Sequence, residues 1–366
     1  MKKLLLLLIS VTLLTGCMGS KTDTLKSFKD YNSKKDTYNL KGEMSIISNE
    51  DEFTYDLTVS VKDNEYYKVS LLNTINNHEQ IILKNDEGVF VVTPNLNKSF
   101  KFMSEWPNNS SQAYIVSSLI NDINKDENAK VTEIKDGYEI VSKVNYPNNQ
   151  KLVNEKITTD KKYNIKTVEV MDSENNTIIK VKVNDIDYSP KFSDTYFNLD
   201  DYIDEEEKDQ SENKDKENNK TEDCLSACKE DDSECKNTCT KEDSLNTSNV
   251  LDEIIYPLYV PTDTYLSSKD TVDTDEGNRV ILTFAGTDPF ILVEEVAKVH
   301  NELDIVPVNG EPVILGGVIG AMADNSLYWT SNGVDYYLTS NTLDSNEMMT
   351  IAESVQNSSS LVASTK

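Results

Sequence analysis

Arginine, histidine and long apolar runs are scarce in this chain of 366 residues. Arg279 is its single arginine, and 36 basic residues stand against 64 acidic ones, which gives a formal net charge of −28 at pH 7. Because phosphate binding requires clustered lysine and arginine, this balance argues against nucleic acid as a partner. The two histidines, His78 and His300, lie far apart in the sequence, so neither a histidine metal site nor a Ser-His-Asp triad is expected. We therefore predict a protein that is not an enzyme and holds no cofactor and no metal.

Only one long apolar run is present, and it lies at the extreme N-terminus. No second run approaches the roughly 20 residues of a membrane-spanning helix, and a hydrophobic content of 37% suits globular parts. Met1-Lys2-Lys3 precedes the run from Leu4 to Leu14, which is too short and wrongly flanked for a stable membrane span. This pattern predicts a signal peptide over residues 1–16.

The run ends in Leu14-Thr15-Gly16-Cys17, which resembles the lipobox of bacterial lipoproteins: Leu, a small residue, Gly or Ala, and Cys. The resemblance implies that Cys17 becomes the N-terminus and carries diacylglycerol and further acyl chains of the palmitate type. Two or three chains on one residue anchor a protein stably, whereas a single chain does not. We therefore expect the chain on the extracytoplasmic face of the cell membrane, with Cys17 as the lipidated residue.

The residues from Tyr38 to about Leu199 follow a strand pattern. From Phe53 to Lys62, apolar and polar residues alternate, as in a half-buried antiparallel strand. Turn signals such as Asp136-Gly137 separate further runs of the same kind. The additional strands are predicted over residues 67–72, 80–83, 89–93, 131–134, 138–141, 156–159, 167–171 and 178–183.

One helix is expected after Trp106-Pro107, with Asn109 and Gln112 as a capping box and an apolar stripe over residues 113–123. A shorter helix is expected around residues 24–31. The fold class predicted from these elements is α+β, mainly β, with an unclosed antiparallel half-barrel and a helical lid. Such a fold keeps an apolar concavity, which the helix either plugs or leaves for a ligand.

The segment from Ile81 to Phe100, followed by the segment from Trp106 to Gln112, resembles the lipoprotein-carrier (LolA-like) lipoproteins of spore-forming bacteria, which include the clostridial GerS-like germination lipoproteins. The resemblance covers about residues 36–200. It implies an unclosed barrel with a helical lid, no catalytic residues, and, for GerS-like members, a cortex-modifying amidase as partner. It also implies action in sporulation or germination, in the space between the mother cell and forespore membranes.

Six aromatic and aliphatic residues are candidates for the concave face of this half-barrel. The sequence leaves two roles open for them, packing in the core or binding an acyl lipid. The candidates are Phe53, Tyr55, Leu57, Phe90, Val92 and Phe102.

A linker follows this region. Residues 201–223 contain eleven acidic residues and four lysines, which predicts a disordered, self-repelling segment. Two C-x3-C pairs follow, and cysteines outside the cytoplasm normally form disulfides. A bend between the pairs would favour nested bridges, whereas one continuous helix would present a stripe that could link two chains. Zinc is disfavoured by the spacing and by the oxidising compartment. The four disulfide candidates are Cys224, Cys228, Cys235 and Cys239.

The C-terminal residues predict a small α+β module. A strand is expected over residues 279–284, followed by a helix that Asp288 caps and Pro289 begins, with a buried stripe from Leu292 to Leu303. Asn332-Gly333 is a hairpin signal, and Asp344 with Glu347 forms a capping box for a last helix. The segment from Gly316 to Gly320 lacks the spacing and the lysine of a phosphate loop, so a tight turn or close packing is expected there.

The C-terminal run from Leu327 to Leu338, with Ile351 to Val355, resembles modules attached to RseB-like extracytoplasmic regulators, which implies an RseB-like two-domain layout. The leading interpretation is a membrane-anchored, non-catalytic lipoprotein that binds a partner protein or an acyl ligand in sporulation or germination. The alternatives are a carrier of lipids or lipoproteins and an RseB-like sensor that regulates a sigma factor. The predicted organisation is a signal peptide (1–16), a tether with a helix (17–35), a LolA-like domain (36–200), an acidic, cysteine-containing linker (201–248) and a small domain (249–366).

Overall fold

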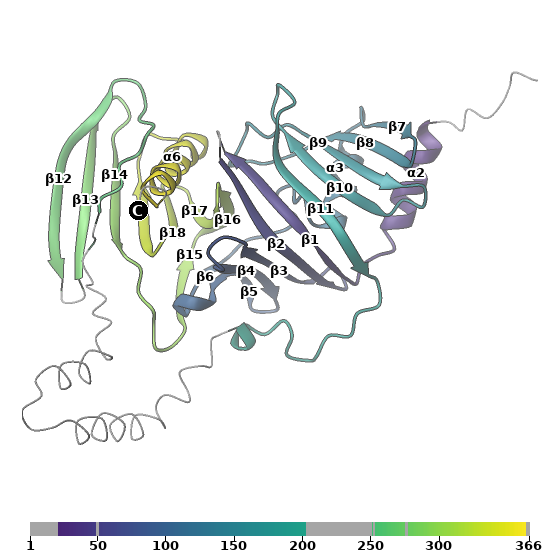
Figure 1. Ribbon diagram of the computed structural model, residues 1–366, viewed down its shortest axis with the longest axis horizontal. Coiled ribbons are helices and arrows are strands. Elements are labelled where there is room, and N and C mark those ends of the chain that lie inside the picture. The colour runs from purple at the N-terminus through teal and green to yellow at the C-terminus, as the bar shows by residue number, and fades with distance from the viewer. Residues whose placement is uncertain (1–20, 49–50, 203–250, 252, 275–276, 364–366) are drawn as a thin grey trace, which may run out of the picture. The chain divides into compact units, whose positions relative to one another are not determined.

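The computed structural model describes residues 21–48, 51–202, 251, 253–274 and 277–363 (Figure 1). These residues form two compact units. The first unit comprises the described parts of Met1–Asn77 and Glu105–Lys191, and the second comprises those of His78–Ser104 and Phe192–Lys366. The signal peptide, Cys17 and the four linker cysteines lie outside the described residues, so their roles stay predictions. Within the described ranges, no helix has the length and apolar character needed to cross a membrane.

The first unit contains one run of antiparallel strands in the order β3-β2-β1-β11-β10-β9-β8-β7. Strands β3 and β7 are not paired with each other, so these strands do not close into a barrel, as the sequence predicts. The strands are β1 (Tyr38–Ser48), β2 (Asp51–Lys62), β3 (Tyr66–Asn73), β7 (Lys130–Ile134), β8 (Gly137–Lys143), β9 (Asn154–Asp160), β10 (Ile165–Met171) and β11 (Thr177–Asp187).

The alternation in β2 positions its side chains as predicted. Tyr55, Leu57 and Val59 are buried, while Asp56 between them is exposed. On the neighbouring strand β1, Gly42 lies at a register shift against β11. A Cβ atom at Gly42 would come within 2.3 Å of the carbonyl oxygen of Lys182, so only glycine permits this close approach of the two backbones.

The described residues of the first unit form two helices, α2 (Lys21–Asn32) and α3 (Val116–Lys125). The buried stripe predicted for α3 is confirmed, but the predicted capping box is wrong, because the helix begins after Ile115, which makes no side-chain cap. The backbone N–H of Val116 instead donates to the hydroxyl of Tyr38 on β1 at 3.1 Å. Gln112 donates its backbone N–H to Ser118 Oγ at 2.8 Å. A group distant in sequence thus satisfies an N–H that a local cap would otherwise serve.

The second unit contains a four-strand run and a seven-stranded sheet. In the four-strand run, ordered β15-β6-β5-β4, β15 pairs with β6 in parallel although about 200 residues separate them. The seven-stranded sheet is ordered β12-β13-β14-β19-β18-β17-β16, and its neighbouring strands are antiparallel. The strands are β4 (Glu79–Asn85), β5 (Gly88–Thr93), β6 (Lys98–Phe102), β12 (Thr264–Thr274), β13 (Gly277–Gly286), β14 (Phe290–Val296), β15 (Asp304–Val308), β16 (Gly310–Leu315), β17 (Val318–Ala323), β18 (Ser326–Ser331) and β19 (Val334–Thr339). The described residues of this unit also form the short helices η1 (Pro94–Leu96) and η2 (Leu199–Tyr202).

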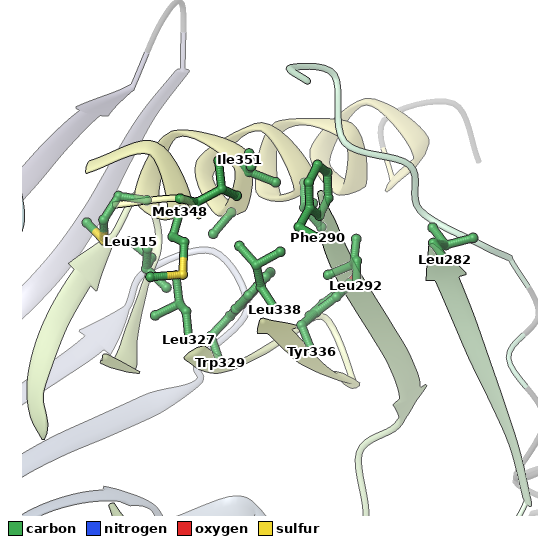
Figure 2. Close-up of a cluster of buried hydrophobic side chains, with 14 of the residues drawn as sticks. Leu282, Phe290, Leu292, Leu315, Leu327, Trp329, Tyr336, Leu338, Met348 and Ile351 are labelled. Carbon is green, nitrogen blue, oxygen red and sulfur yellow. The ribbon is translucent and has the colours of Figure 1, made fainter. Parts of the chain in front are cut away.

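Helix α6 (Ser345–Ala363) covers one face of the seven-stranded sheet, hereafter the inner face. Figure 2 shows Met348 reaching from this helix toward Leu327 on β18, with Leu338 and Phe290 nearby. The Asp344 half of the predicted capping box is confirmed, since the backbone N–H of Glu347 donates to Asp344 Oδ1 at 2.9 Å. The predicted hairpin at Asn332-Gly333 is also confirmed, and both residues have positive φ, as a type I′ turn requires.

The helix predicted after Asp288-Pro289 is wrong, because residues 290–296 form strand β14. Phe290 and Leu292 are buried while Ile291 between them is exposed, which is a period of two rather than of 3.6. The strand pairs with β13 on one side and with β19 on the other. Pairing on both sides overrides the local helix-start signal, and the aromatic and β-branched residues of this run suit a strand.

Candidate interaction cleft

The six residues predicted for a concave face are divided between the two units. Those in the first unit lie on β2, and those in the second unit lie on β5 and β6. Five of them are at most 4% exposed, and Phe53 is half-buried. None of the six lines either of the two cavities described below. The buried residues are Tyr55, Leu57, Phe90, Val92 and Phe102; their ligand role stays a prediction.

A polar cavity of about 450 Å³ lies beside α3 in the first unit. Amide and hydroxyl side chains make up most of its lining, and Asn124 accepts a hydrogen bond from Lys29 Nζ at 2.9 Å. No lining residue is ionisable, so these residues offer hydrogen bonds but no acid or base. The lining comprises Pro107, Asn108, Ser117, Ser118, Ile120, Asn121 and Asn124.

A second cavity, the interaction cleft, lies in the second unit and measures about 220 Å³. Its lining comes from β6, β14, β15, β18 and β19 and from the segment between β14 and β15. The parallel pairing of β6 with β15 brings Phe100 opposite Val306 and so places residues from distant parts of the sequence in one cleft. The lining is Lys98, Phe100, Val293, Glu295, Val296, Lys298, His300, Asp304, Val306, Tyr328, Trp329, Asp335, Tyr336 and Tyr337.

An apolar row crosses the outer face of the seven-stranded sheet, the face opposite α6. Ile281 pairs with Val293, Val293 with Tyr337, and Tyr337 with Tyr328, so the four side chains stand side by side on β13, β14, β19 and β18. All four are half-buried. The rings of Tyr328 and Tyr337 lie 4.4 Å apart, and Phe100 lies 6.2 Å from Tyr328. The row therefore ends in the aromatic wall of the cleft.

An ion-pair row runs beside the apolar row, two residues along each strand. Arg279 Nη2 lies 2.8 Å from Glu295 Oε2, and Lys98 Nζ lies 2.9 Å from Asp335 Oδ2. Thr330 Oγ1 also donates to Asp335. His300 and Asp304 form a further pair at 3.8 Å. The Arg279–Glu295 and Lys98–Asp335 pairs each join one positive and one negative charge, so the ion-pair row is close to neutral.

The titration of Tyr328 reflects its position in the cleft. Burial raises the pKa of its hydroxyl to about 12, and the hydrogen bond and negative potential of Tyr337 act in the same direction. The phenol of Tyr328 therefore stays neutral at physiological pH and serves as a hydrogen-bonding aromatic surface. Trp329, next to Tyr328 in the chain, is 1% exposed, and its indole N–H has no hydrogen-bond partner among the described residues.

Two carboxyl groups are buried at helix α3 in the first unit, one on the helix and one on strand β9. Asp122 on α3 is 4% exposed, and Glu155 on β9 is 1% exposed and accepts a hydrogen bond from Ser142 Oγ at 2.9 Å. Burial raises the pKa of Asp122 to about 6, against the opposing effects of Ser111 and Lys125. Burial, and then the charge of Asp122, raises the pKa of Glu155 well above its ordinary value.

The cleft itself is not predicted from the sequence. The run from Leu327 to Leu338 predicts a hairpin, which is correct, but period-two alternation does not say which partner strand faces Tyr328. That depends on the parallel pairing of β6 with β15, which has no local signal. The predicted residues Phe90 and Phe102 lie on β5 and β6 near Phe100 in sequence but are buried in the core.

Comparisons with known proteins place the chain among sporulation proteins. No family model matches it. The sporulation protein YdcC of Bacillus subtilis (strain 168) is 34% identical over 356 residues, which is 96% of each chain. This relative confirms the expected kinship with proteins of spore-forming bacteria.

Two solved structures illustrate the chains to which this one is similar. A chain of the Pseudomonas aeruginosa MucA/MucB complex is 8% identical, with a TM-score of 0.30, and the match covers 90% of this chain and 97% of that chain. A chain of the Clostridioides difficile complex of the CwlD amidase with the GerS lipoprotein is 20% identical, with a TM-score of 0.28, and the match covers 48% and 100%. By its identity and coverage with the Bacillus subtilis relative, the chain belongs to the family of the sporulation protein YdcC.

Proposed function

We propose that this chain is a non-catalytic lipoprotein of the sporulating cell envelope, anchored through Cys17 on the extracytoplasmic face, which binds a partner protein. Membership of a sporulation protein family carries the proposal. The lipobox at Leu14 to Cys17 supports the anchor. The interaction cleft, which has an aromatic wall beside paired charges, supports binding. A cortex-modifying amidase is the first partner to test.

The chemistry of the two cavities supports binding rather than catalysis. The polar cavity in the first unit has no ionisable lining residue. In the interaction cleft, Asp335 and Glu295 are engaged with Lys98 and Arg279, and Asp304 Oδ2 lies 3.8 Å from His300 Nε2, so each of these carboxylates already faces a basic side chain. A general acid or base needs a group free to exchange a proton with substrate.

An acyl-carrier role in the first unit receives less support. Tyr55 and Leu57, two of its candidate residues, are at most 4% exposed and pack in the core of that unit. An acyl chain in their place would require these side chains to move. If delipidated full chain bound a fluorescent fatty acid at one equivalent, the carrier role would replace partner binding.

The proposal is tested by genetics in the native host. We expect deletion of the gene to lower the yield of heat-resistant, germination-competent spores. A Cys17→Ala chain, which cannot be lipidated, should reproduce the deletion, whereas Ser20→Ala, three residues away, should behave as wild type. Normal sporulation in the deletion strain would exclude a sporulation role, and full function of the Cys17→Ala chain would exclude the anchor.

A further inference from the structure

We propose that the outer face of the seven-stranded sheet docks an extended, basic segment of the partner protein, with one apolar side chain of that segment seated in the interaction cleft. This inference rests on the proposed partner-binding function and assigns it a surface. Four observations carry it: the cleft volume, the register of the apolar row, the pairing of the charges beside it and the charge of the surrounding chain.

The volume of the cleft fits a side chain rather than a free ligand. Pockets for small molecules usually measure about 300–1,000 Å³. The interaction cleft measures about 220 Å³ and is bounded by Phe100, Tyr328 and Tyr337. Protein interfaces concentrate their binding energy in pockets that receive one aromatic or large aliphatic side chain. An aromatic wall of this size is suited to such an anchor.

The apolar row gives the segment its path. Neighbouring strands lie about 4.8 Å apart, so the row from Ile281 through Val293 and Tyr337 to Tyr328 spans roughly 14 Å. An extended chain covers that distance in about four or five residues. Ile291, which lies on the same face of β14, is 37% exposed and widens the apolar path.

The charge of the surrounding chain selects a basic segment. Residues 251–366 contain 18 acidic and 4 basic residues. Two of those basic residues, Arg279 and Lys298, lie at the outer face, and Arg279 is already paired with Glu295. The field outside the ion-pair row is therefore negative and attracts lysine and arginine. The same field repels the carboxylate or phosphate group of an acidic lipid, which favours a protein segment over a lipid.

The test uses the full chain reconstituted in phosphatidylcholine nanodiscs. Random 12-residue peptides displayed on phage are selected against it, and one enriched peptide is synthesised for calorimetry. We expect enriched peptides to carry an aromatic or large aliphatic residue close to lysine or arginine. Binding should weaken when salt is raised, because the long-range attraction is screened.

Matched variants locate the site. Tyr337→Ala should weaken binding by about tenfold or more, while Tyr337→Phe should retain it because the ring remains. Val293→Lys, which places a cation in the floor without truncating the core, should abolish binding. Ile75→Ala is the control, since Ile75 is 80% exposed, belongs to the first unit and does not line the cleft. Thermal melts establish that each variant is folded.

Three results would overturn the inference: selection of acidic peptides, binding that Tyr337→Ala and Val293→Lys leave unchanged, or a concentration-dependent dimer that Val293→Lys abolishes. The last would assign the face to a second copy of the chain. Spore assays separate this inference from the proposed function. If deletion impairs sporulation but the Val293→Lys strain sporulates normally, the assigned surface is wrong while the sporulation role stands.

Discussion

Glu294 is a carboxyl group on the inner face of β14, beside the apolar cluster under α6. Its side chain is fully buried, and Oε2 accepts the backbone N–H of Ile255 at 3.0 Å. Oε1 has no hydrogen-bond partner among the described residues. Burial raises the pKa of this carboxyl to about 7, although the hydrogen bond from Ile255 acts in the opposite direction. Near neutral pH, Glu294 is thus close to half-protonated inside the second unit.

Replacing Glu294 with glutamine should make the second unit less sensitive to pH. The folded state binds the proton more tightly than the unfolded state, so the wild-type free energy of unfolding falls as pH rises from about 4.3 to about 7. Glutamine keeps an acceptor for Ile255 but does not ionise. Glu294→Gln should therefore exceed wild type by roughly 3 kcal/mol at pH 8 and approach it at pH 4.

The fluorescence of Trp329 reports the unfolding of the second unit. The chain has one other tryptophan, Trp106, which is changed to phenylalanine in every variant so that Trp329 gives the signal. The pH 4 measurement serves as the control. A Glu294→Gln protein that is less stable than wild type at pH 8 would mean that the ionised carboxylate is the native form.

At this scale the sequence predicts positions better than roles. The hairpin residues Tyr328 and Tyr337 are correctly expected on adjacent strands, because type I′ turns fix the register locally. Their role in a cleft depends on β15, which pairs with β6 from about 200 residues away. The burial of Glu294 likewise cannot be predicted from the sequence, since it follows from the pairing of β14 with strands on both sides.

Among the elements, the stability of α3 depends on the protonation of two buried carboxyl groups. Asp122 belongs to the helix and Glu155 to β9, and the pKa of each is raised first by burial. Ser111, from the loop before the helix, hydrogen-bonds Asp122, and Ser142 on β8 hydrogen-bonds Glu155. Lys125 on α3 is a nearby cation that acts to lower the pKa of Asp122. The protonated forms are favoured in the folded state, so stability falls as pH rises above the ordinary range of a carboxyl group and through about 6.

Hydrogen exchange should show this dependence in α3. After correction for intrinsic rates, the amides of Val116–Lys125 should be less protected at pH 8 than at pH 5. Glu155→Gln should restore protection at pH 8, because it removes the carboxyl group that interacts with Asp122 and keeps an acceptor for Ser142. Glu127→Gln, an exposed position just after the helix, is the charge-matched control. Equal protection of wild type at both pH values would contradict a role for the buried pair.

Helix α6 depends on its N-terminal cap. Asp344 Oδ1 accepts the backbone N–H of Glu347, which satisfies one of the free N–H groups of the first turn. Asp344→Ala should lower the free energy of unfolding of the second unit by about 1 kcal/mol, whereas Asp344→Ser should lower it less. Urea titration followed by Trp329 fluorescence measures both. An unchanged midpoint for Asp344→Ala would show that the packing of Met348 and Ile351 alone holds the helix.

The elements differ in how far they can be predicted, and the reason is the range of the interactions that fix them. Asp344 with Glu347 correctly predicts a helix start because the cap and its N–H lie three residues apart. Asp288-Pro289 gives a similar signal, but the helix predicted from it is wrong, because the residues that follow pair as strand β14 with β13 and β19. The start of α3 is likewise fixed by Tyr38, 78 residues away.

For the whole molecule, the net charge of −28 should make stability depend on salt. Like charges repel in the compact state, and raising the salt from about 10 mM to about 150 mM shortens the screening length from roughly 30 Å to 8 Å. We expect the melting temperature at pH 7 to rise over this range. Lowering the pH to 5 should also raise it, because the net negative charge decreases and the buried carboxyl groups accept protons.

The two contributions can be separated in one protein. A Glu155→Gln, Glu294→Gln double variant lacks two of the buried carboxyl groups but keeps nearly all of the surface charge. Its melting temperature should therefore vary less with pH than that of wild type, while its dependence on salt is retained. If salt instead lowers the melting temperature, screened ion pairs such as Lys98–Asp335 and Arg279–Glu295 contribute more to stability than the net repulsion removes. In that case the ion-pair row, rather than the acidity of the chain, would dominate the electrostatics of the second unit.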